Sequence, residues 1–213
     1  LDAHLLNASL TGRAGTLVGY GYWLQDQDVA TASTRTLGLR WTGERPAGPA
    51  TLGWTLEAAR QRGHAGNPLD VDAGYFLVEP SLGLRGLAWK LGWERLGGDG
   101  VAAFQTPLAT LHAFNGWADK FLTTPVNGLD DRYASVSGKF GSGRLEDKLG
   151  WTVAFHDFEA DRGGAAYGRE WNASLSFPLP AGLTGLVKLA DYRSDGFARD
   201  TRKVWLQVER TWP

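Results

Sequence analysis

Apolar and polar residues alternate along many short stretches of the chain. In "ATLGWTLEA", residues 50–58, Leu52, Trp54 and Leu56 are each separated by one polar or small residue. Successive side chains of a β-strand point to opposite faces of the sheet, so a period of two predicts a strand. The same period recurs in "RTLGLRWT", "RGLAWKLGWE", "YASVSGKF", "LGWTVAF" and "EWNASLSF". No segment of helical length competes convincingly with these patterns.

The alternation and the turn residues between the runs predict eleven strands. Their expected ranges are 2–12, 15–25, 33–45, 49–62, 70–82, 86–97, 131–141, 148–158, 168–178, 183–193 and 202–212. The connections alternate in length along the chain. Short ones are "TGRAG", "RPAGP", "SLGLRG", "FGSGRLEDK" and "PLPAG", and the longer ones are "QDQDVATA", "RGHAGNPL", residues 98–130, "EADRGGAAYG" and "RSDGFARDT".

The two faces of these strands differ in chemistry. The apolar face is rich in tryptophan, often near a strand end, at Trp23, Trp41, Trp93 and Trp171, whereas the other face carries Gly, Ser, Thr, Asn, Lys and Glu. Short turns at one end, longer loops at the other and aromatic residues near the strand ends are typical of an outer-membrane barrel. We therefore predict an all-β transmembrane antiparallel up-and-down β-barrel. The alternative is a soluble β-sandwich or lipocalin-like barrel, whose apolar face is its core.

Composition narrows the class of protein further. The 213 residues contain no linker-like tract, so we expect one domain over residues 1–213. Lys and Arg (22) nearly balance Asp and Glu (23), and no basic patch indicates a nucleic-acid partner. The chain contains no run of 18 or more apolar residues, so no transmembrane helix is expected. Cysteine is absent, which excludes disulfides and thiolate chemistry.

The number of predicted strands is odd. Single-chain bacterial barrels have an even number of strands, so we expect either one further strand, twelve in all, or strands that precede Leu1. The sequence contains no methionine, not even an initiator. We therefore expect the chain to be part of a larger barrel.

Several segments resemble a known family. "DAGYFLVEPSLGL", "HDFEAD", "YGREWNASLSF" and residues 97–133 look like the C-terminal portion of the alginate export-like family of Gram-negative outer-membrane β-barrels, or of its porin-like relatives. The likeness covers residues 70–212 and is most specific over 97–133. It implies an outer-membrane location and a passive diffusion or polysaccharide-export pore. The chain departs from such barrels at its end, "ERTWP", where Trp212 rather than the last residue is aromatic.

Charged residues on the polar face are candidates for lining a pore. Both signs are present, and such residues set ion and solute selectivity. The alternative is that they pair across adjacent strands and only hold the wall together. The pore-lining candidates are Arg40, Glu57, Lys90, Glu94, Lys139, Glu170, Lys188 and Glu209.

Residues 98–130 form the longest connection and do not follow a strand period. Long loops are usually functional or disordered, and the Phe, Leu and Trp content of this one argues against disorder. Irregular backbone is tolerated inside a barrel but not against lipid, so we expect the loop to fold inward and narrow the pore. The alternatives are that the loop forms a lid on the outer rim of the barrel or a docking surface for a partner. The constriction candidates are His112, Phe114, Trp117, Asp119, Lys120 and Phe121.

Other chemistry is weakly indicated. No G-x-S-x-G or comparable nucleophile motif is present, and His156 and Asp157 point to opposite faces of their strand. We expect no enzymatic activity, no cofactor and no metal centre. The acidic segments "DFEAD" and "LDD", with Asp130 and Asp131, are possible Ca²⁺ ligands, but we interpret them as solvated loop acids.

Function therefore has two main interpretations. The first is a channel for passive diffusion or export of small hydrophilic solutes or saccharides, with membrane lipid and hydrophilic solutes or polysaccharide as partners. The second is a non-conducting barrel, adhesive or structural, that binds a partner through its loops.

Overall fold

The computed structural model describes residues 1–109, 114–140 and 149–211, and all eleven predicted strands are present in it. Every strand begins and ends within two residues of its predicted limits. The strands are β1 (Asp2–Gly12), β2 (Gly15–Gln25), β3 (Thr34–Ala47), β4 (Ala50–Gly63), β5 (Asp72–Leu84), β6 (Leu87–Leu96), β7 (Leu129–Phe140), β8 (Leu149–Glu159), β9 (Ala166–Leu179), β10 (Leu183–Ser194) and β11 (Thr201–Arg210). No helix in the described parts is long and apolar enough to cross a bilayer.

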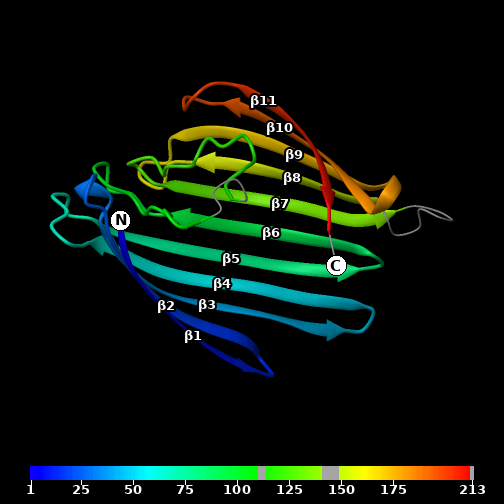
Figure 1. The fold of residues 1–213 in the computed structure, drawn as a ribbon, viewed down its shortest axis with the longest axis horizontal. Helices are drawn as coiled ribbons and strands as arrows, with labels where there is room; N and C mark the ends of the chain where they lie inside the picture. The colour runs from blue at the N-terminus through cyan, green and yellow to red at the C-terminus, as the bar shows by residue number, and fades with distance from the viewer. Residues whose placement is uncertain (110–113, 141–148, 212–213) are drawn as a thin grey trace.

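Each strand pairs antiparallel with its neighbour in the sequence, so the sheet runs from β1 to β11 without a crossover. It curves strongly (Figure 1), and within the described residues no pairing joins β1 to β11. The short connections, such as 13–14, 48–49 and 85–86, lie at one end of the sheet. The longer ones, including 64–71 and 97–128, lie at the other. The predicted all-β up-and-down architecture is confirmed.

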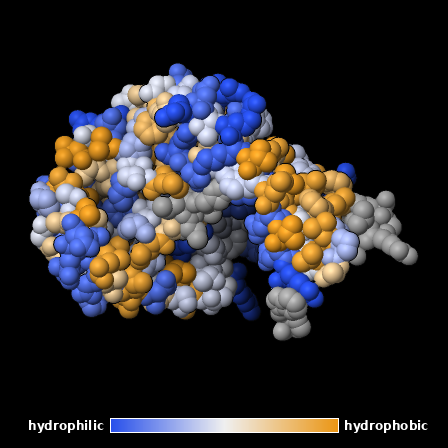
Figure 2. Space-filling view, turned by 45° about the horizontal axis from the view of Figure 1, so that its top comes forward, coloured by the Kyte–Doolittle hydropathy of each residue, from blue (hydrophilic) through white to orange (hydrophobic). Residues whose placement is uncertain are grey.

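One face of the sheet exposes large apolar side chains. Trp41, Leu91, Trp171 and Leu206 belong to this set, and Leu91 and Leu206 are 63% and 79% exposed. Apolar patches are visible over the surface in Figure 2. Soluble monomers rarely expose large contiguous apolar areas, and a soluble sandwich or lipocalin would bury this face. The exposed apolar face therefore contradicts the soluble alternative.

The opposite face, here called the inner face, is the one that the described residues of the 97–128 connection contact. The buried core of the molecule lies between this connection and the wall, at the end that carries the longer loops. Its side chains include Phe104, Phe121, Leu129, Phe158 and Tyr192. The core is thus built by the irregular segment and the inner face together, and not by two layers of sheet.

Two tyrosines on the inner face lie flat across glycines of the neighbouring strand. Tyr20 of β2 pairs in register with Gly38 of β3, and its hydroxyl donates to Glu57 of β4 at 2.6 Å. A Cβ at position 38 would lie 2.3 Å from the Tyr20 ring. The absence of a side chain at Gly38 therefore lets the phenol bridge three strands. Tyr133 makes the same kind of bridge across Gly92 of β6.

Candidate functional site

All eight pore-lining candidates lie on the inner face. Strand register places Arg40 opposite Glu57 and Lys188 opposite Trp205, and alternation along each strand brings the others to the same side. Their surroundings differ. Arg40 pairs with Glu57 at 2.6 Å and Lys90 with Glu79 at 3.0 Å.

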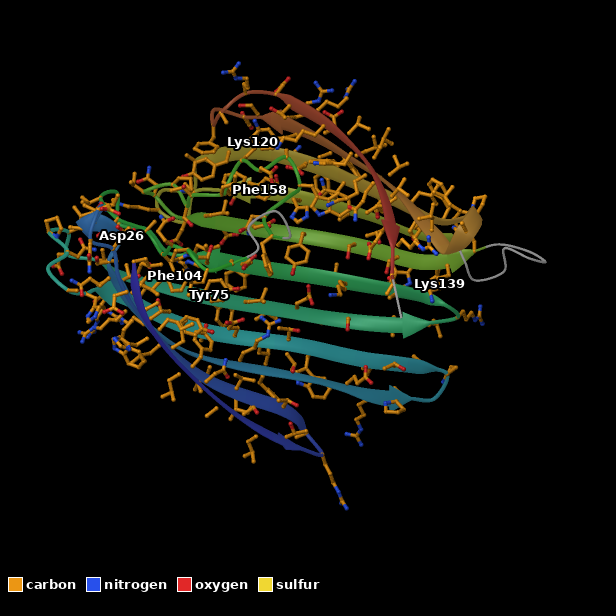
Figure 3. All side chains as sticks on the ribbon, in the orientation of Figure 1. Asp26, Tyr75, Phe104, Lys120, Lys139 and Phe158 are labelled. Carbon is orange, nitrogen blue, oxygen red and sulfur yellow. The ribbon has the colours of Figure 1, made fainter. Side chains whose placement is uncertain are left out.

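The remaining candidates divide by position along the strands. Glu94 and Glu170 are buried beneath the 97–128 connection. Lys139 and Glu209 are exposed toward the end with the short turns, and Figure 3 shows Lys139 at the opposite end of the sheet from Asp26. Pairing across adjacent strands, the alternative to pore lining, therefore applies to Arg40 and Glu57 and to Lys90, whose partner is Glu79.

Two glutamines and a threonine hold the root of the 97–128 connection against β4. The side chain of Gln61 accepts from the backbone N–H of Gln105 at 2.8 Å and donates to its carbonyl oxygen at 2.9 Å. The side chain of Gln105 makes the same pair of bonds with the backbone of Thr124, at 2.9 and 3.0 Å. Gln61 is 1% exposed, and its amide also donates to the Thr36 hydroxyl at 3.0 Å. The buried amide is thus hydrogen-bonded on both its nitrogen and its oxygen, and its bonds to Gln105 fix the segment to the wall.

The middle of the connection turns sharply above three carboxylates. Asn115 and Gly116 have φ of +53° and +81°, and a Cβ at Gly116 would lie 2.6 Å from the Glu170 carboxylate. The Asn115 side-chain amide donates to Glu94 at 2.9 Å and to Asp131 at 3.2 Å. The backbone N–H of Ala118 donates to Glu170 at 2.8 Å.

Beyond this turn the chain reaches the last two strands. Asp119 forms an ion pair with Lys203 of β11 at 2.6 Å, and Lys120 Nζ donates to the hydroxyl of Thr201 at 2.6 Å. Lys188 of β10 lies over the Trp117 ring, 4.2 Å from its centroid, an attractive cation–π distance. Burial is the main cause that lowers the pKa of Lys120, with Lys203 and Arg199 adding like-charge repulsion.

Phe121 anchors the second half of the connection through aromatic contacts. Its ring centroid lies 4.6 Å from that of Phe158, 5.9 Å from Tyr167 and 5.3 Å from Phe197. Phe121 is buried.

The first half begins with an aspartate that caps a tight turn. The Asp99 carboxylate accepts from the backbone N–H groups of Val101 and Ala102 at 2.7 and 2.8 Å. These two bonds lower the pKa of Asp99, because they stabilise its charged form. Phe104 then packs on Tyr75 of β5, with the ring centroids 5.2 Å apart (Figure 3).

The connection leaves a cavity of about 610 Å³ between itself and strands β1–β6. Tyr20, Tyr22, Arg40 and Glu57 line its wall, and Phe114 is among the residues of the connection that line it. The Tyr20 and Tyr22 rings stack with their centroids 5.0 Å apart. The cavity therefore combines aromatic faces with an ion pair.

Five of the six constriction candidates lie in the described residues. Trp117, Asp119, Lys120 and Phe121 contact the inner face directly. Phe114 lines the cavity and is 49% exposed. His112 lies outside the described residues.

The interpretation of Asp130 and Asp131 as solvated loop acids is wrong. Both residues belong to β7, and Asp131 is fully buried because the connection covers it. Its carboxylate contacts His156 Nδ1 at 3.0 Å. Of the "DFEAD" acids, Asp161 lies in a loop but forms an ion pair with Arg95. In the described parts of the chain, no group of three His, Asp or Glu residues has a metal-binding arrangement.

Sequence reasoning did not identify the residues that hold the connection in place. Gln61, Gln105 and Asn115 are uncharged and follow no motif, so only the fold reveals them. The tyrosine bridges, in contrast, could have been found from the sequence. Gly38 and Gly92 alternate with the polar residues of their strands, and each lies opposite a tyrosine of the neighbouring strand. Glycine within a strand indicates close approach of another group.

No family model matches the chain, and no curated protein matches its sequence. Structure comparison, however, finds its fold in proteins of Pseudomonas aeruginosa, among them the outer membrane protein OpdK. OccK10 (OpdN) aligns over 100% of this chain and 61% of its own length, with a TM-score of 0.74 and 18% identity. OpdK solved with vanillate aligns over 97% and 55%, with a TM-score of 0.75 and 18% identity.

OccK2 (OpdF) in complex with glucuronate aligns over 97% of this chain and 61% of its own length, with a TM-score of 0.72 and 17% identity. The chain thus spans between 55% and 61% of the length of these three proteins. At these identities the likeness concerns the fold. The predicted porin-like barrel architecture is confirmed, and the finer assignment to the alginate export-like family stays a prediction.

Proposed function

We propose that the protein is an outer-membrane channel of a Gram-negative bacterium that passes small hydrophilic solutes by diffusion, with residues 98–130 as its constriction. The observation that carries this proposal is the position of that segment. It covers the inner face from β4 to β11 and is tied to both sides by Gln61 and Lys203. Irregular backbone of this kind is tolerated in a membrane protein only where protein or water surrounds it.

The exposed apolar face supports a membrane location. Lipid solvates outward side chains such as Leu91 and Leu206, whereas the inner face carries the charged residues. Such a division between lipid and lumen is typical of outer-membrane barrels. The pore-lining role of the eight candidates follows from this orientation and remains part of the proposal.

The size and chemistry of the cavity favour small solutes. A volume of about 610 Å³ lies in the range of sites for drug-sized ligands, roughly 300–1,000 Å³. Two proteins of similar fold were solved with vanillate and with glucuronate. We extend this to the present chain as small hydrophilic solutes, monosaccharides included. Export of a polysaccharide would require the constriction to move aside. For the adhesive or structural alternative, no contact among the described residues provides support.

Single-channel recording of the full-length protein in a planar bilayer tests the proposal. The variants are a deletion of residues 104–124 and, as a control, replacement of the exposed loop residue Asp28 by Asn. We expect steady channels whose conductance rises on deletion and does not change in the control. Steady channels with the same conductance after deletion would contradict the constriction, and silence from every form would contradict the channel.

A further inference from the structure

Beneath the turn at Asn115–Ala118 lies a group of ionisable side chains whose burial the proposed pore-lining role does not explain. Glu94 of β6, Asp131 of β7 and Glu170 of β9 are 7%, 0% and 0% exposed, and His156 of β8 lies among them. We call these four residues the acid cluster. Each of the three carboxylates accepts at least one hydrogen bond. With all three ionised, however, the acid cluster carries more negative than positive charge.

The charge balance of the acid cluster is unfavourable when every carboxylate is ionised. In the described parts of the chain, no Lys or Arg forms an ion pair with Glu94, Asp131 or Glu170. Asp131 contacts His156 at 3.0 Å, which compensates at most one charge. An unpaired charge in a buried site is costly, and neighbouring carboxylates that share a site retain protons for this reason.

The hydrogen bonds of the acid cluster also indicate that a carboxylate in it is protonated. Among the described residues, no hydrogen-bond partner is found for the buried Oε2 atom of Glu170 or the buried Oδ1 atom of Asn172. Asn172 already donates its Nδ2 to Glu170 Oε1 at 2.6 Å. Two buried acceptors on neighbouring side chains therefore lack a donor in the described residues, and a proton bound to Glu170 would relieve the cost of burying its carboxylate.

The 97–128 connection is what buries the cluster. The Asn115 amide covers Glu94 and Asp131, and the Ala118 N–H reaches Glu170. If this turn moves away, solvent reaches the carboxylates and their ionisation becomes easier. The closed arrangement therefore binds more protons than the open one. By linkage, acid favours the closed arrangement and alkali favours the open one.

We propose that the acid cluster is a proton-binding site that closes the constriction: proton uptake holds residues 115–118 against the wall, and proton loss releases them. Glu94 and Glu170 are the groups that take up and lose the protons, because the Asp131 carboxylate is already paired with His156. The other ionisable side chains facing it are Glu57 on β4, Tyr75 on β5, Tyr133 on β7, Tyr192 on β10 and Lys120 of the connection. The effect on conductance rests on the proposed channel function.

The root of the connection provides an internal contrast. Gln61, Gln105 and Thr124 hold it through amide and backbone groups that do not titrate. Proton loss is therefore expected to release only residues 115–118 from the wall and to leave the root of the connection in place. A variant at Gln61 loosens the segment at every pH, whereas a variant in the cluster changes its response to pH.

A spin label reports the position of the turn without reference to conductance. These 213 residues contain no cysteine, so Phe114→Cys, at a half-exposed position, introduces one thiol into them for a nitroxide label, and the labelled protein is studied in detergent micelles. We expect the mobile fraction in the EPR spectrum to be larger at about pH 8.5 than at about pH 5.5, values on either side of the ordinary imidazole pKa. A mobile fraction that is equal at the two pH values, or larger in acid, overturns the proposal.

Matched variants identify the groups responsible. In the labelled protein, the double variant Glu94→Gln, Glu170→Gln keeps hydrogen-bonding groups but cannot lose a proton, so the label should stay immobile at both pH values. The control Asp28→Asn should keep the full response, and Gln61→Ala should raise mobility equally at both. A pH response that survives in the double variant also overturns the proposal.

Planar-bilayer recordings separate this inference from the channel itself. If both hold, conductance of the unmodified protein falls in acid and the double variant has low conductance at either pH. If the label responds to pH but the protein never conducts, the result supports the proton site and contradicts the channel. Steady conductance with a label that ignores pH leaves the channel and contradicts the proton site.

Discussion

The hydroxyl of Tyr133 on β7 donates to Glu79 on β5 at 2.7 Å, although β6 lies between them. The phenol can cross because Gly92 of β6 has no side chain, and a Cβ there would lie 2.0 Å from the Tyr133 ring. Glu79 also pairs with Lys90 at 3.0 Å. One glycine thus permits a polar link over three strands on the inner face.

We predict that Gly92→Ala destabilises the barrel by about 1–3 kcal/mol, the usual cost of overpacking a closely packed site. The new methyl group displaces the Tyr133 ring from β6 and breaks its bond to Glu79. Urea-induced unfolding in detergent micelles measures the change. Gly74→Ala is the matched control, because no atom lies within 4 Å of a Cβ at that strand position. Equal stability of the two variants would contradict the prediction.

Gln61→Leu should loosen the root of the 97–128 connection. Leucine keeps the buried volume but leaves the backbone N–H and carbonyl of Gln105 without partners, at a cost of about 1–3 kcal/mol. Limited proteolysis of the folded protein should therefore cut within 104–124 faster than in the unmodified chain. Thr55→Val, another inner-face position of β4, should leave the cleavage rate unchanged. An unaltered rate in the Gln61 variant would show that other contacts suffice.

Phe121→Ala should cost about 3–5 kcal/mol in the free energy of unfolding, as truncation of a buried phenylalanine does. The ring is buried among Phe158, Tyr167 and Phe197. Phe114→Ala removes the same side chain at a position that is 49% exposed, so its effect should be small. Thermal unfolding of both variants checks the difference. Similar melting temperatures would mean that Phe121 contributes little to the core.

A charge should be tolerated on one face of the wall and not on the other. Leu91→Arg places a cation on the exposed apolar face and should weaken insertion into lipid vesicles by about 2–4 kcal/mol if it lies near the bilayer midplane. Thr55→Arg lies on the inner face in register with Glu79 and should insert normally. Folding yields in vesicles measure both. Equal yields would argue that lipid does not contact Leu91.

The strands could be predicted from sequence because alternation at period two is a local property. Each strand pairs with its sequence neighbour, so the order of the sheet followed from connection lengths alone. The contacts of the 97–128 connection could not be predicted in this way. Asp119 and Lys203 are 84 residues apart, and nothing in either local sequence specifies the partner. Asp131 was misread as a loop acid because its burial depends on a segment that folds over it from elsewhere in the chain.

The 97–128 connection also has a consequence for the order of assembly. Hairpins between sequence neighbours can form one after another, since each requires only adjacent residues. The connection, by contrast, needs Gln61 on β4 and Lys203 on β11 at the same time. It can therefore dock fully only after the last strand has joined the wall. Protection of residues 104–124 from protease would accordingly mark the completion of the barrel in a time course of biogenesis.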